Sequence, residues 1–422
     1  MGLGKFLRKV ALTSALVGSM MPFYAGATEP IKSSKLSGVE RKVEQDCPYV
    51  EEWTKTFKEE GATVYTNDMT IDSNGDIVFA GYTSKNHLDV RVEKTGPNGN
   101  SKWVFEWGGE GQDIAEGVCT TQEQGETFHY VVGRTYSTEN GKSDGFGLKL
   151  KDDGTSVLLK TFGGIKSDSF NSVCASENKG VYVAGYTSVS GGDSWILSLD
   201  EDLNTNWKKI PSQDKYESFA NSICQAQEKD GFSFVGYIVD EYDEDILRIR
   251  LENFDSNGNQ RFAKTLGTEY SHASKIIPLS GGGYALPGCI YYDMGDLEFH
   301  LMLVNSDGTS RGKQLTWGVR DNYNILRDAC ELNDEIISVG EIAGEEIGSN
   351  ERPYVVGISK NLEFNWELKP ENFKYSKFNC IESLPDKEGF IVAGNQGAGS
   401  EAFLIKYSLP TTDIKGSYWA LY

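Results

Sequence analysis

The sequence of 422 residues predicts an all-β fold, a seven-bladed β-propeller of four-stranded antiparallel blades. A glycine follows a β-rich run seven times, at intervals of 51 to 54 residues: Gly81, Gly133, Gly185, Gly236, Gly288, Gly340 and Gly394. A repeat near 50 residues is typical of propellers and solenoids, whose units need their neighbours. Abundant glycine and aromatic residues, with few prolines, favour twisted sheets and tight turns. Seven units fill residues 48–410.

The first 27 residues predict a signal peptide. Lys5, Arg8 and Lys9 form a basic start, and the apolar stretch ends in the small residues 25–27, typical of a cleavage site. A retained membrane helix is the weaker alternative, because the stretch is short and interrupted by a proline. Residues 28–47 predict a polar, flexible leader. We therefore expect a secreted, periplasmic or extracellular protein without a membrane span after signal removal.

Within each unit, the second strand is the clearest element. Residues 77–81 and 181–185 are apolar runs rich in β-branched and aromatic side chains, as expected for a strand covered on both faces. The third strand leads into a polar hairpin, such as residues 255–259. The glycine that closes the second strand is expected to allow close approach of two backbones near the centre of the ring.

The fourth strand often begins with a large aromatic side chain: Trp53, Trp103, Trp207, Phe262 or Trp366. A strand of this type, residues 53–57, precedes the first complete unit. We predict that it completes the last blade and closes the ring, which leaves only short, protected edges. The aromatic end of the tail 411–422, residues 418–422, is the competing candidate for this place.

These repeats resemble two known groups of propellers. Residues 255–262 and 99–103 resemble the tryptophan-docking repeat of quinoprotein-like propellers. Residues 81–84 and 185–188 resemble repeats of secreted bacterial β-propeller proteins of the SBBP type. The resemblance is one of repeat style and covers nearly the whole mature chain. It implies an extracellular scaffold, and several units lack the tryptophan, so it does not imply a quinone cofactor.

Two series of acidic residues are candidate binding residues. The first opens the third strand: Asp89, Asp144, Asp193, Asp245, Glu298 and Glu401. The second, Asp113 and Asp168, precedes the first strand. In a propeller, the loops before these two strands emerge on the same face. The carboxylates either accept hydrogen bonds from their own turns or form an acidic face that attracts a cation or a basic partner.

The cysteines predict a buried apolar position rather than a metal site. Five cysteines share one predicted repeat position, where other units carry Met69 or residues 276–277: Cys119, Cys174, Cys224, Cys330 and Cys380. Cys47 is expected to be the reactive or exposed thiol. Hairpins such as residues 72–76 resemble calcium loops without completing the twelve-residue pattern. We expect no cofactor, with calcium as the alternative.

Composition and motifs leave two functional hypotheses. A formal net charge of −21 repels nucleic acid and favours basic partners. No Ser-His-Asp arrangement or histidine ligand set is present in the repeat. We expect a secreted or surface-associated scaffold that binds a protein or glycan through its loop face without catalysis. The alternative is an extracellular glycan hydrolase or lyase, with carboxylates roughly 5–10 Å apart near the propeller axis.

Overall fold

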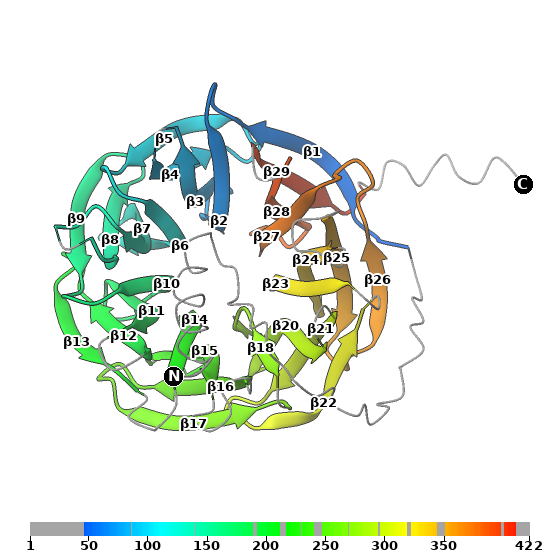
Figure 1. Cartoon of the computed structure of the whole chain (residues 1–422). Coiled ribbons are helices and arrows are strands. Elements are labelled where there is room, and N and C mark those ends of the chain that lie inside the picture. The colour runs from blue at the N-terminus through cyan, green and yellow to red at the C-terminus, as the bar shows by residue number, and fades with distance from the viewer. Residues whose placement is uncertain are drawn as a thin grey trace, which may run out of the picture.

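Consecutive strands pair into antiparallel sheets arranged as a ring (Figure 1). The computed structural model describes residues 46–410 except 86, 140, 189–191, 212–216, 229, 240–246, 269, 294–295, 319–321, 344–350 and 398–400. The predicted signal peptide, most of the leader and the tail 411–422 lie outside the described residues. Among the described residues, no helix has the length and apolar character needed to cross a membrane.

The sheets divide into seven blades, which confirms the predicted fold class. Five sheets have four strands each, and a nine-stranded sheet holds two further blades joined by one parallel bridge, Leu297 to Tyr323. The first strands lie nearest the axis: β2 (Thr63–Ile71), β6 (Asp113–Glu123), β10 (Asp168–Ala175), β14 (Glu217–Gln225), β18 (Ser271–Ala273) with β19 (Ile277–Pro278), β23 (Tyr323–Leu332) and β27 (Ser376–Ser383).

The other strands follow outward in order. The second strands are β3 (Ile77–Ser84), β7 (Glu126–Thr135), β11 (Val181–Thr187), β15 (Phe232–Val239), β20 (Tyr284–Asp293), β24 (Glu335–Ala343) and β28 (Gly389–Gln396). The third strands are β4 (Leu88–Thr95), β8 (Asp144–Lys151), β12 (Asp193–Leu199), β16 (Leu247–Phe254), β21 (Asp296–Val304), β25 (Arg352–Ser359) and β29 (Glu401–Ser408). The rim strands are β5 (Ser101–Trp107), β9 (Ser156–Phe162), β13 (Thr205–Lys209), β17 (Gln260–Leu266), β22 (Ser310–Trp317), β26 (Phe364–Leu368) and β1 (Val50–Phe57).

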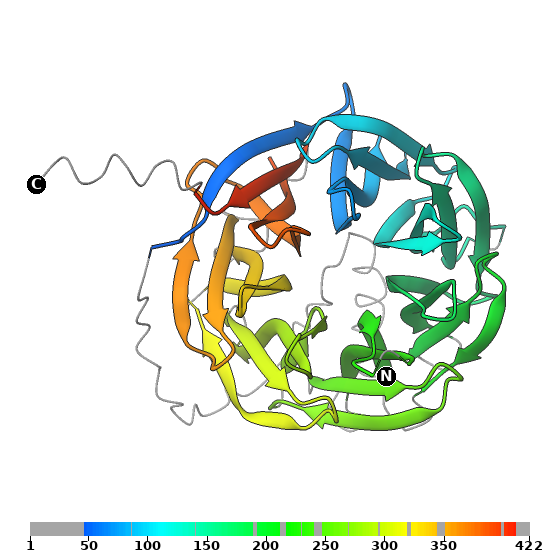
Figure 2. The ribbon, with the colours of Figure 1, turned by 180° about the vertical axis from the view of Figure 1, so that it is seen from behind.

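The N-terminal strand β1 closes the ring, as predicted for residues 53–57. It pairs antiparallel with β29, so blade seven consists of β27, β28, β29 and β1. The blue strand β1 lies beside the red strand β29 in both views (Figure 1, Figure 2). Phe57 is buried with Phe79 of blade one, at a ring-centroid distance of 4.9 Å. The two ends of the propeller are therefore held together by one shared sheet.

The seven closing glycines lie against the backbone of the first strands, which explains why glycine recurs at this position. A Cβ atom on any of them would lie 1.7–2.1 Å from a first-strand carbonyl oxygen. In six blades, the first strand carries a one-residue register shift beside this contact, as between Phe170 and Ser172. A bulge leaves its extra residue unpaired and bends the strand. The glycine and the bulge therefore form one structural feature.

The bulge residues connect the blades around the axis. Four of them are asparagines that donate a side-chain N–H to a carbonyl oxygen of the next blade: Asn67 to Ala115 (2.8 Å), Asn171 to Ala220 (2.9 Å), Asn221 to Ala273 (3.0 Å) and Asn379 to Thr66 (2.6 Å). The last of these bonds joins blade seven to blade one. Each of these bonds gives a backbone carbonyl oxygen near the axis a donor from the neighbouring blade.

The hydrophobic core lies between the blades. Seven clusters each combine side chains of two neighbouring blades. For example, Val78 and Val90 of blade one pack with Phe146 and Leu148 of blade two. Because each blade buries its two faces only against its neighbours, the stability of every blade depends on the whole ring.

The predicted rim tryptophans pack against the neighbouring blade. Trp103 donates its indole N–H to the carbonyl oxygen of Asp152, at 2.9 Å, and a Cβ on Gly154 would lie 2.8 Å from its ring. Trp207 makes the equivalent hydrogen bond to Ser256, at 3.1 Å. The aromatic position and the glycine of the hairpin are thus complementary parts of one contact between blades.

Candidate functional site

The two faces of the ring differ in their connections. Because the strands are antiparallel, the loops before the first and third strands lie on one face, here called the loop face, and the short turns lie on the other. The predicted acidic residues with described positions lie at strand starts on the loop face. Asp245 lies outside the described residues.

The acids at the start of the first strands hold their own loops. Asp113 is fully buried, and its Oδ2 accepts hydrogen bonds from the Gly109 amide and the Ser137 hydroxyl, both at 2.8 Å. Asp168, exposed by 2%, accepts a hydrogen bond from the Gly164 amide at 3.1 Å. These two carboxylates therefore accept hydrogen bonds from their own turns, which is the first of the two alternatives that the sequence left open.

Acids of the third strand face acids of the next blade. A Cβ on Gly108 would meet both Asp89 (2.0 Å) and Asp113 (3.0 Å). Burial and the charge of Asp113 raise the pKa of Asp89. The same arrangement recurs at Asp144 and Asp168, where burial and the charge of Asp168 raise the pKa of Asp144. Four of the predicted acids therefore meet in two pairs between neighbouring blades.

The acidic series is not continuous around the ring. Asp89 pairs with the residue two positions after the closing glycine of the second strand. In the same register, this position is held by Arg248 in blade four and by Arg352 in blade six. Glu298 and Glu401 hold the position in blades five and seven, and Asp193 holds it in blade three. Glu401 accepts hydrogen bonds from Gln396 (3.0 Å) and Lys58 (3.4 Å), which lower its pKa. In blade four this position is held by Arg248, and the predicted Asp245 lies outside the described residues.

Aromatic side chains form part of the inner surface near the loop face. Tyr186 of blade three lies 5.5 Å from Phe219 of blade four, which stacks on Tyr237 at 4.9 Å. Tyr237 in turn lies 5.5 Å from His272 of blade five. On blade one, Tyr65 and Tyr82 stack at 4.5 Å. Tyr65, Tyr186 and Phe219 are half-buried, so each retains a ring surface in contact with solvent.

Charged side chains complete this inner surface. Arg134 pairs with Glu116 at 2.5 Å in blade two, and Arg327 pairs with Glu341 at 2.7 Å in blade six. Arg134 is exposed by 6%, and its Nε and Nη2 have no hydrogen-bond partner among the described residues. Burial and repulsion by Arg327 lower the pKa of Lys377 in blade seven. We call this set of aromatic and charged residues, which come from all seven blades, the inner ring of the loop face.

Carboxylates also reach the axis, although the sequence predicted other ones. Lys275 of blade five lies 2.9 Å from Asp68 of blade one and 3.8 Å from Asp328 of blade six. Glu382 of blade seven lies within electrostatic reach of all three. Asp68 and Asp328 occupy the same repeat position, directly after the bulge, but other blades carry Ser172, Ser222 or Cys380 there, so no acidic pattern marked the position in the sequence. Among the described residues, no group of three or more His, Cys, Asp or Glu side chains is arranged to hold a metal ion.

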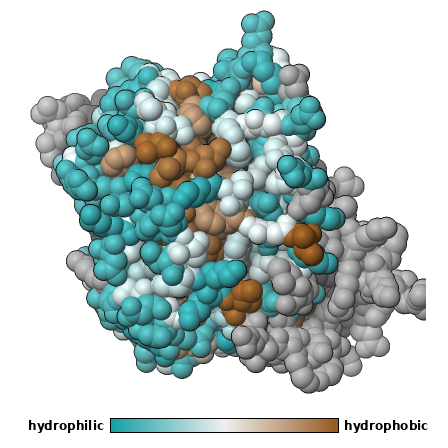
Figure 3. Space-filling model, turned by 90° about the vertical axis from the view of Figure 1, so that its left-hand side faces the viewer, coloured by the Kyte–Doolittle hydropathy of each residue, from teal (hydrophilic) through white to brown (hydrophobic). Residues whose placement is uncertain are grey.

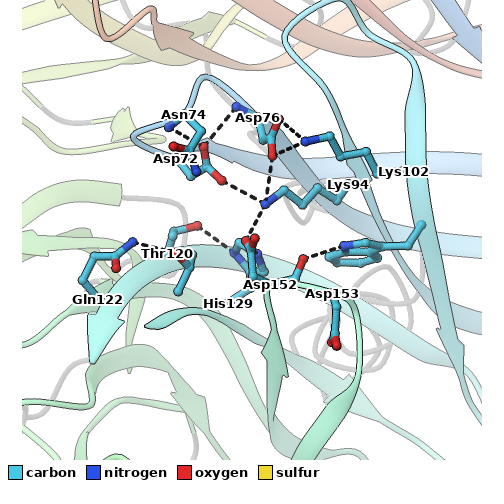
Figure 4. A network of polar contacts seen from close by, with 12 residues as sticks. Asp72, Asn74, Asp76, Lys94, Lys102, Thr120, Gln122, His129, Asp152 and Asp153 are labelled. Carbon is cyan, nitrogen blue, oxygen red and sulfur yellow. Dashed lines mark hydrogen bonds and ion pairs between the residues drawn. The ribbon is translucent and has the colours of Figure 1, made fainter. Parts of the chain in front are cut away.

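The Asp-rich turn 72–76, which resembles a calcium loop in sequence, contacts a lysine (Figure 4). Lys94 is exposed by 1%, and its ammonium lies 2.9 Å from Asp72, 3.1 Å from Asp76 and 2.5 Å from Asp152 of blade two. His129 is fully buried beside it, and burial, with repulsion by Lys94, lowers its pKa to about 4. This network on the turn face joins blades one and two, and its ammonium lies where the oxygens of the turn converge.

The cysteines agree only in part with the predicted position. Cys119, Cys174, Cys224 and Cys330 each pair with the residue three before the closing glycine, but Cys380 pairs with the residue directly before it. Glu382 takes the cysteine position in blade seven, and Thr70, rather than Met69, takes it in blade one. Counting along the chain fails here because the turns between first and second strands differ in length.

Cys47 is not the exposed, reactive thiol that the sequence predicted. It packs against the core between blades six and seven, and its Sγ lies 3.5 Å from the carbonyl oxygen of Tyr49. Burial raises the pKa of Cys47 to about 11, so its thiolate is scarce near neutral pH. All seven cysteines are free thiols, half-buried or buried.

Apolar surface also occurs on the rim. The side of the ring that carries β9 shows hydrophobic area between polar residues (Figure 3). β9 exposes Val157 by 42% and Leu159 by 37%, and the loop that follows exposes Ile165 by 85%. This surface lies on blade two, outside the inner ring of the loop face.

The comparisons with known proteins identify the architecture. No protein-family profile and no curated protein matches the sequence. The crystal structure of Raptor from Chaetomium thermophilum is similar, with a TM-score of 0.51 and 13% identity over 84% of this chain and 29% of the Raptor chain. Sqt1 from the same organism gives a TM-score of 0.48 and 11% identity over 82% of this chain and 87% of its own. This chain thus spans less than a third of the Raptor chain, and the likeness is one of fold alone.

Proposed function

We propose that this protein is a non-enzymatic scaffold that binds a protein or glycan ligand at the inner ring of the loop face. The observation that carries the proposal is the combination of solvent-contacting Tyr65, Tyr186 and Phe219 with buried ion pairs on the intervening blades. Aromatic rings provide large contact areas at low entropic cost, and the polar groups fix orientation.

The charge of the molecule favours a neutral or basic ligand. The net charge is −21, whereas the ion pairs of the inner ring nearly balance one another. Such a field attracts cationic partners and weakens at high ionic strength. We further propose that the protein acts outside the cytoplasm, as the basic and apolar segment 1–27 indicates.

The contacts of the axial carboxylates favour a binding function over glycan cleavage. A retaining or inverting hydrolase needs one free carboxylate as nucleophile or base and one as acid. Here Asp68 and Asp328 already bind Lys275. Asp68 Oδ2 also accepts a hydrogen bond from the Val118 amide, and Asp328 accepts hydrogen bonds from the Ala329 and Ile381 amides. The hydrolase or lyase remains the second hypothesis, to be tested by the same experiment.

The test measures binding of neutral and amino-sugar oligosaccharides and of a lysine-rich peptide to the mature chain by calorimetry. Tyr186→Ser and Lys377→Met are expected to weaken binding at least tenfold, because they remove a ring surface and a charge from the inner ring. Lys208→Met on the exposed rim strand β13 is the matched control and should bind normally. Unchanged affinity in both inner-ring variants contradicts the site. Cleavage of the oligosaccharide, abolished by Glu116→Gln, favours the enzyme.

A further inference from the structure

Lys275 occupies an unusual break in the repeat. In blade five, the first strand is split into β18 and β19, and Lys275 lies in the gap between them. The first strands of the other six blades, all within the described residues, continue through a single bulge. Lys275 lies outside the assigned pairing of these two strands, and its side chain reaches two other blades.

The ammonium of Lys275 spans the axis. Its Nζ lies 2.9 Å from Asp68 Oδ1 on blade one, although blades six and seven separate these blades around the ring (Figure 1). The same nitrogen lies 3.8 Å from Asp328 Oδ2 on blade six. Lys275 is half-buried, whereas the Asp68 and Asp328 side chains are exposed by 11% and 5%. Burial opposes the charge of Lys275, but Asp328 and Asp68 raise its pKa above the ordinary value.

The two aspartates extend this contact to two more blades. Asp68 Oδ2 accepts a hydrogen bond from the Val118 amide of blade two, at 3.0 Å. Asp328 Oδ2 accepts one from the Ile381 amide of blade seven, at 3.2 Å. A single ammonium therefore holds carboxylates that connect blades one, two, five, six and seven.

Glu382 is half-buried and directly follows Ile381, whose amide binds Asp328, so a third carboxylate-bearing residue lies beside this cluster. The charged or titratable groups that face it are Asp68, Lys275, Asp328 and Lys387, with the thiols Cys380 and Cys330 nearby. Burial and the charge of Asp328 raise the pKa of Glu382 to about 8. Burial raises the pKa of Asp328 to about 6. Two carboxylates share Lys275, and burial favours the protonated form of Glu382.

We propose that Lys275, Asp68 and Asp328 form an axial clasp that closes the ring, and that deprotonation of Glu382 weakens it. An ionised Glu382 adds a third carboxylate to a site with one ammonium, and like charges repel strongly in a partly dehydrated site. The clasp is then a pH-sensitive device built into the first strands. It is independent of any ligand on the loop face.

The sign of the effect follows from the proton balance. Because the folded chain binds the Glu382 proton more tightly than the unfolded chain, the free energy of unfolding falls as pH rises toward 8. Above pH 8, both states lack the proton and this contribution levels off. The fall between pH 7 and 8.5 is expected to lower Tm of the full chain by about 1–2 °C.

The first experiment is calorimetry of the full chain at pH 7.0 and 8.5. Glu382→Gln keeps the side-chain shape without the titration, so its Tm should not fall in this interval. Lys149→Met is the matched control, since Lys149 is a buried lysine paired with Glu123 at 2.6 Å on blade two. It should be less stable and keep the fall of the parent. Equal falls in the parent and in Glu382→Gln overturn the role of Glu382.

A second measurement tests the clasp itself. In Lys275→Met, hydrogen exchange at the Val118 and Ile381 amides should be at least tenfold faster at pH 7.0. The Ile223 amide donates to Ser172 at a junction without the clasp, at 3.3 Å, and should be unchanged. Unchanged exchange at Val118 and Ile381 overturns the clasp. If Lys275→Met does not fold, Lys275→Arg provides the same comparison with the charge retained, and exchange near the parental rate is expected.

Discussion

Each closing glycine is explained by one atom of the neighbouring strand. At Gly185, a Cβ would lie 1.9 Å from the Ser169 carbonyl oxygen, far inside van der Waals contact. The same clash is present in all seven blades, at 1.7–2.1 Å. Glycine thus recurs at this position of every repeat because two backbones are in close contact there, near the axis.

Gly185→Ala should therefore destabilise the protein by about 3 kcal/mol or more, because the backbones must separate or the strand must shift. Gly164→Ala is the control, since a Cβ there meets no atom within 4 Å. Urea unfolding of both variants at pH 7 measures the difference. Equal midpoints would show that the inner strands can move apart freely.

Each carboxylate that faces a second acid between blades destabilises the folded protein when it is charged. Burial and the neighbouring acid raise the pKa values of Asp89 and Asp144, so the folded chain binds these protons more tightly than the unfolded chain does. Asp89→Asn and Asp144→Asn should each stabilise the protein at pH 7 by roughly 0.2–1 kcal/mol, as like charges facing each other are separated. Thermal unfolding with calcium and with a chelator provides the control. If calcium raises Tm of the parent but not of these variants, the pairs bind the ion and the expected stabilisation is contradicted.

The rim strands hold neighbouring blades by one aromatic residue and one hydrogen bond. Trp103→Phe keeps most of the ring but loses the bond to the Asp152 carbonyl, and should cost about 1 kcal/mol. Trp103→Ala also loses packing on Gly154 and should cost about 3 kcal/mol. Val104→Ala on the same strand, exposed by 45%, should change stability by less than about 0.5 kcal/mol. Urea unfolding compares the three, and equal losses would exclude a specific role for the indole.

The strand β1 is the element on which ring closure depends. A chain that begins at residue 58 leaves the β29 edge unpaired and removes Phe57 from the core between blades seven and one. Its Tm should be lower by about 10 °C or more, or the chain should aggregate. A chain that begins at residue 46 keeps β1 and should melt like the mature protein. Restoration of the truncated chain by a peptide of residues 48–58 would identify pairing as the cause, and an unaltered Tm would contradict it.

The pH dependence of the free energy of unfolding is governed by buried groups whose pKa shifts act in opposite directions. Burial lowers the pKa of His129, His272 and His300 to about 4 each, below their ordinary value near 6.5. The folded chain therefore binds fewer protons at these sites, and the free energy of unfolding rises between pH 4 and 6.5. Glu382 has the opposite sign and lowers it toward pH 8.

The free energy of unfolding should consequently be greatest near pH 6.5. Urea unfolding at pH 4.5, 6.5 and 8.5 measures the profile, and His300→Asn should flatten its acidic side. A maximum at pH 8.5 would show that the histidines or Glu382 titrate normally in the folded state.

Much of the fold was predictable because it depends on local patterns. The closing glycines and the apolar second strands reflect contacts that recur in every repeat, and the rim tryptophans reflect one that recurs in several. The acids at strand starts were predicted for the same reason, and Asp113 and Asp168 bond their own loops. Strand registers were less predictable, because the turns between strands vary in length. Cys380 does not take the position of the other cysteines, and Arg248 takes the position that Asp89 holds in blade one.

The sequence by itself determined the blade architecture, since periodic apolar runs and tight turns are local properties. It left residues 53–57 and 418–422 as two candidates for the closing strand, and the structure pairs β1 with β29. Tertiary structure alone decided which side chains meet at the axis. Asp68 and Lys275 are 207 positions apart and share no motif, yet ring closure brings them to 2.9 Å. Tyr186 and Phe219 likewise become neighbours only when adjacent blades pack. Such contacts depend on the angle and register between blades, which no short stretch of sequence encodes.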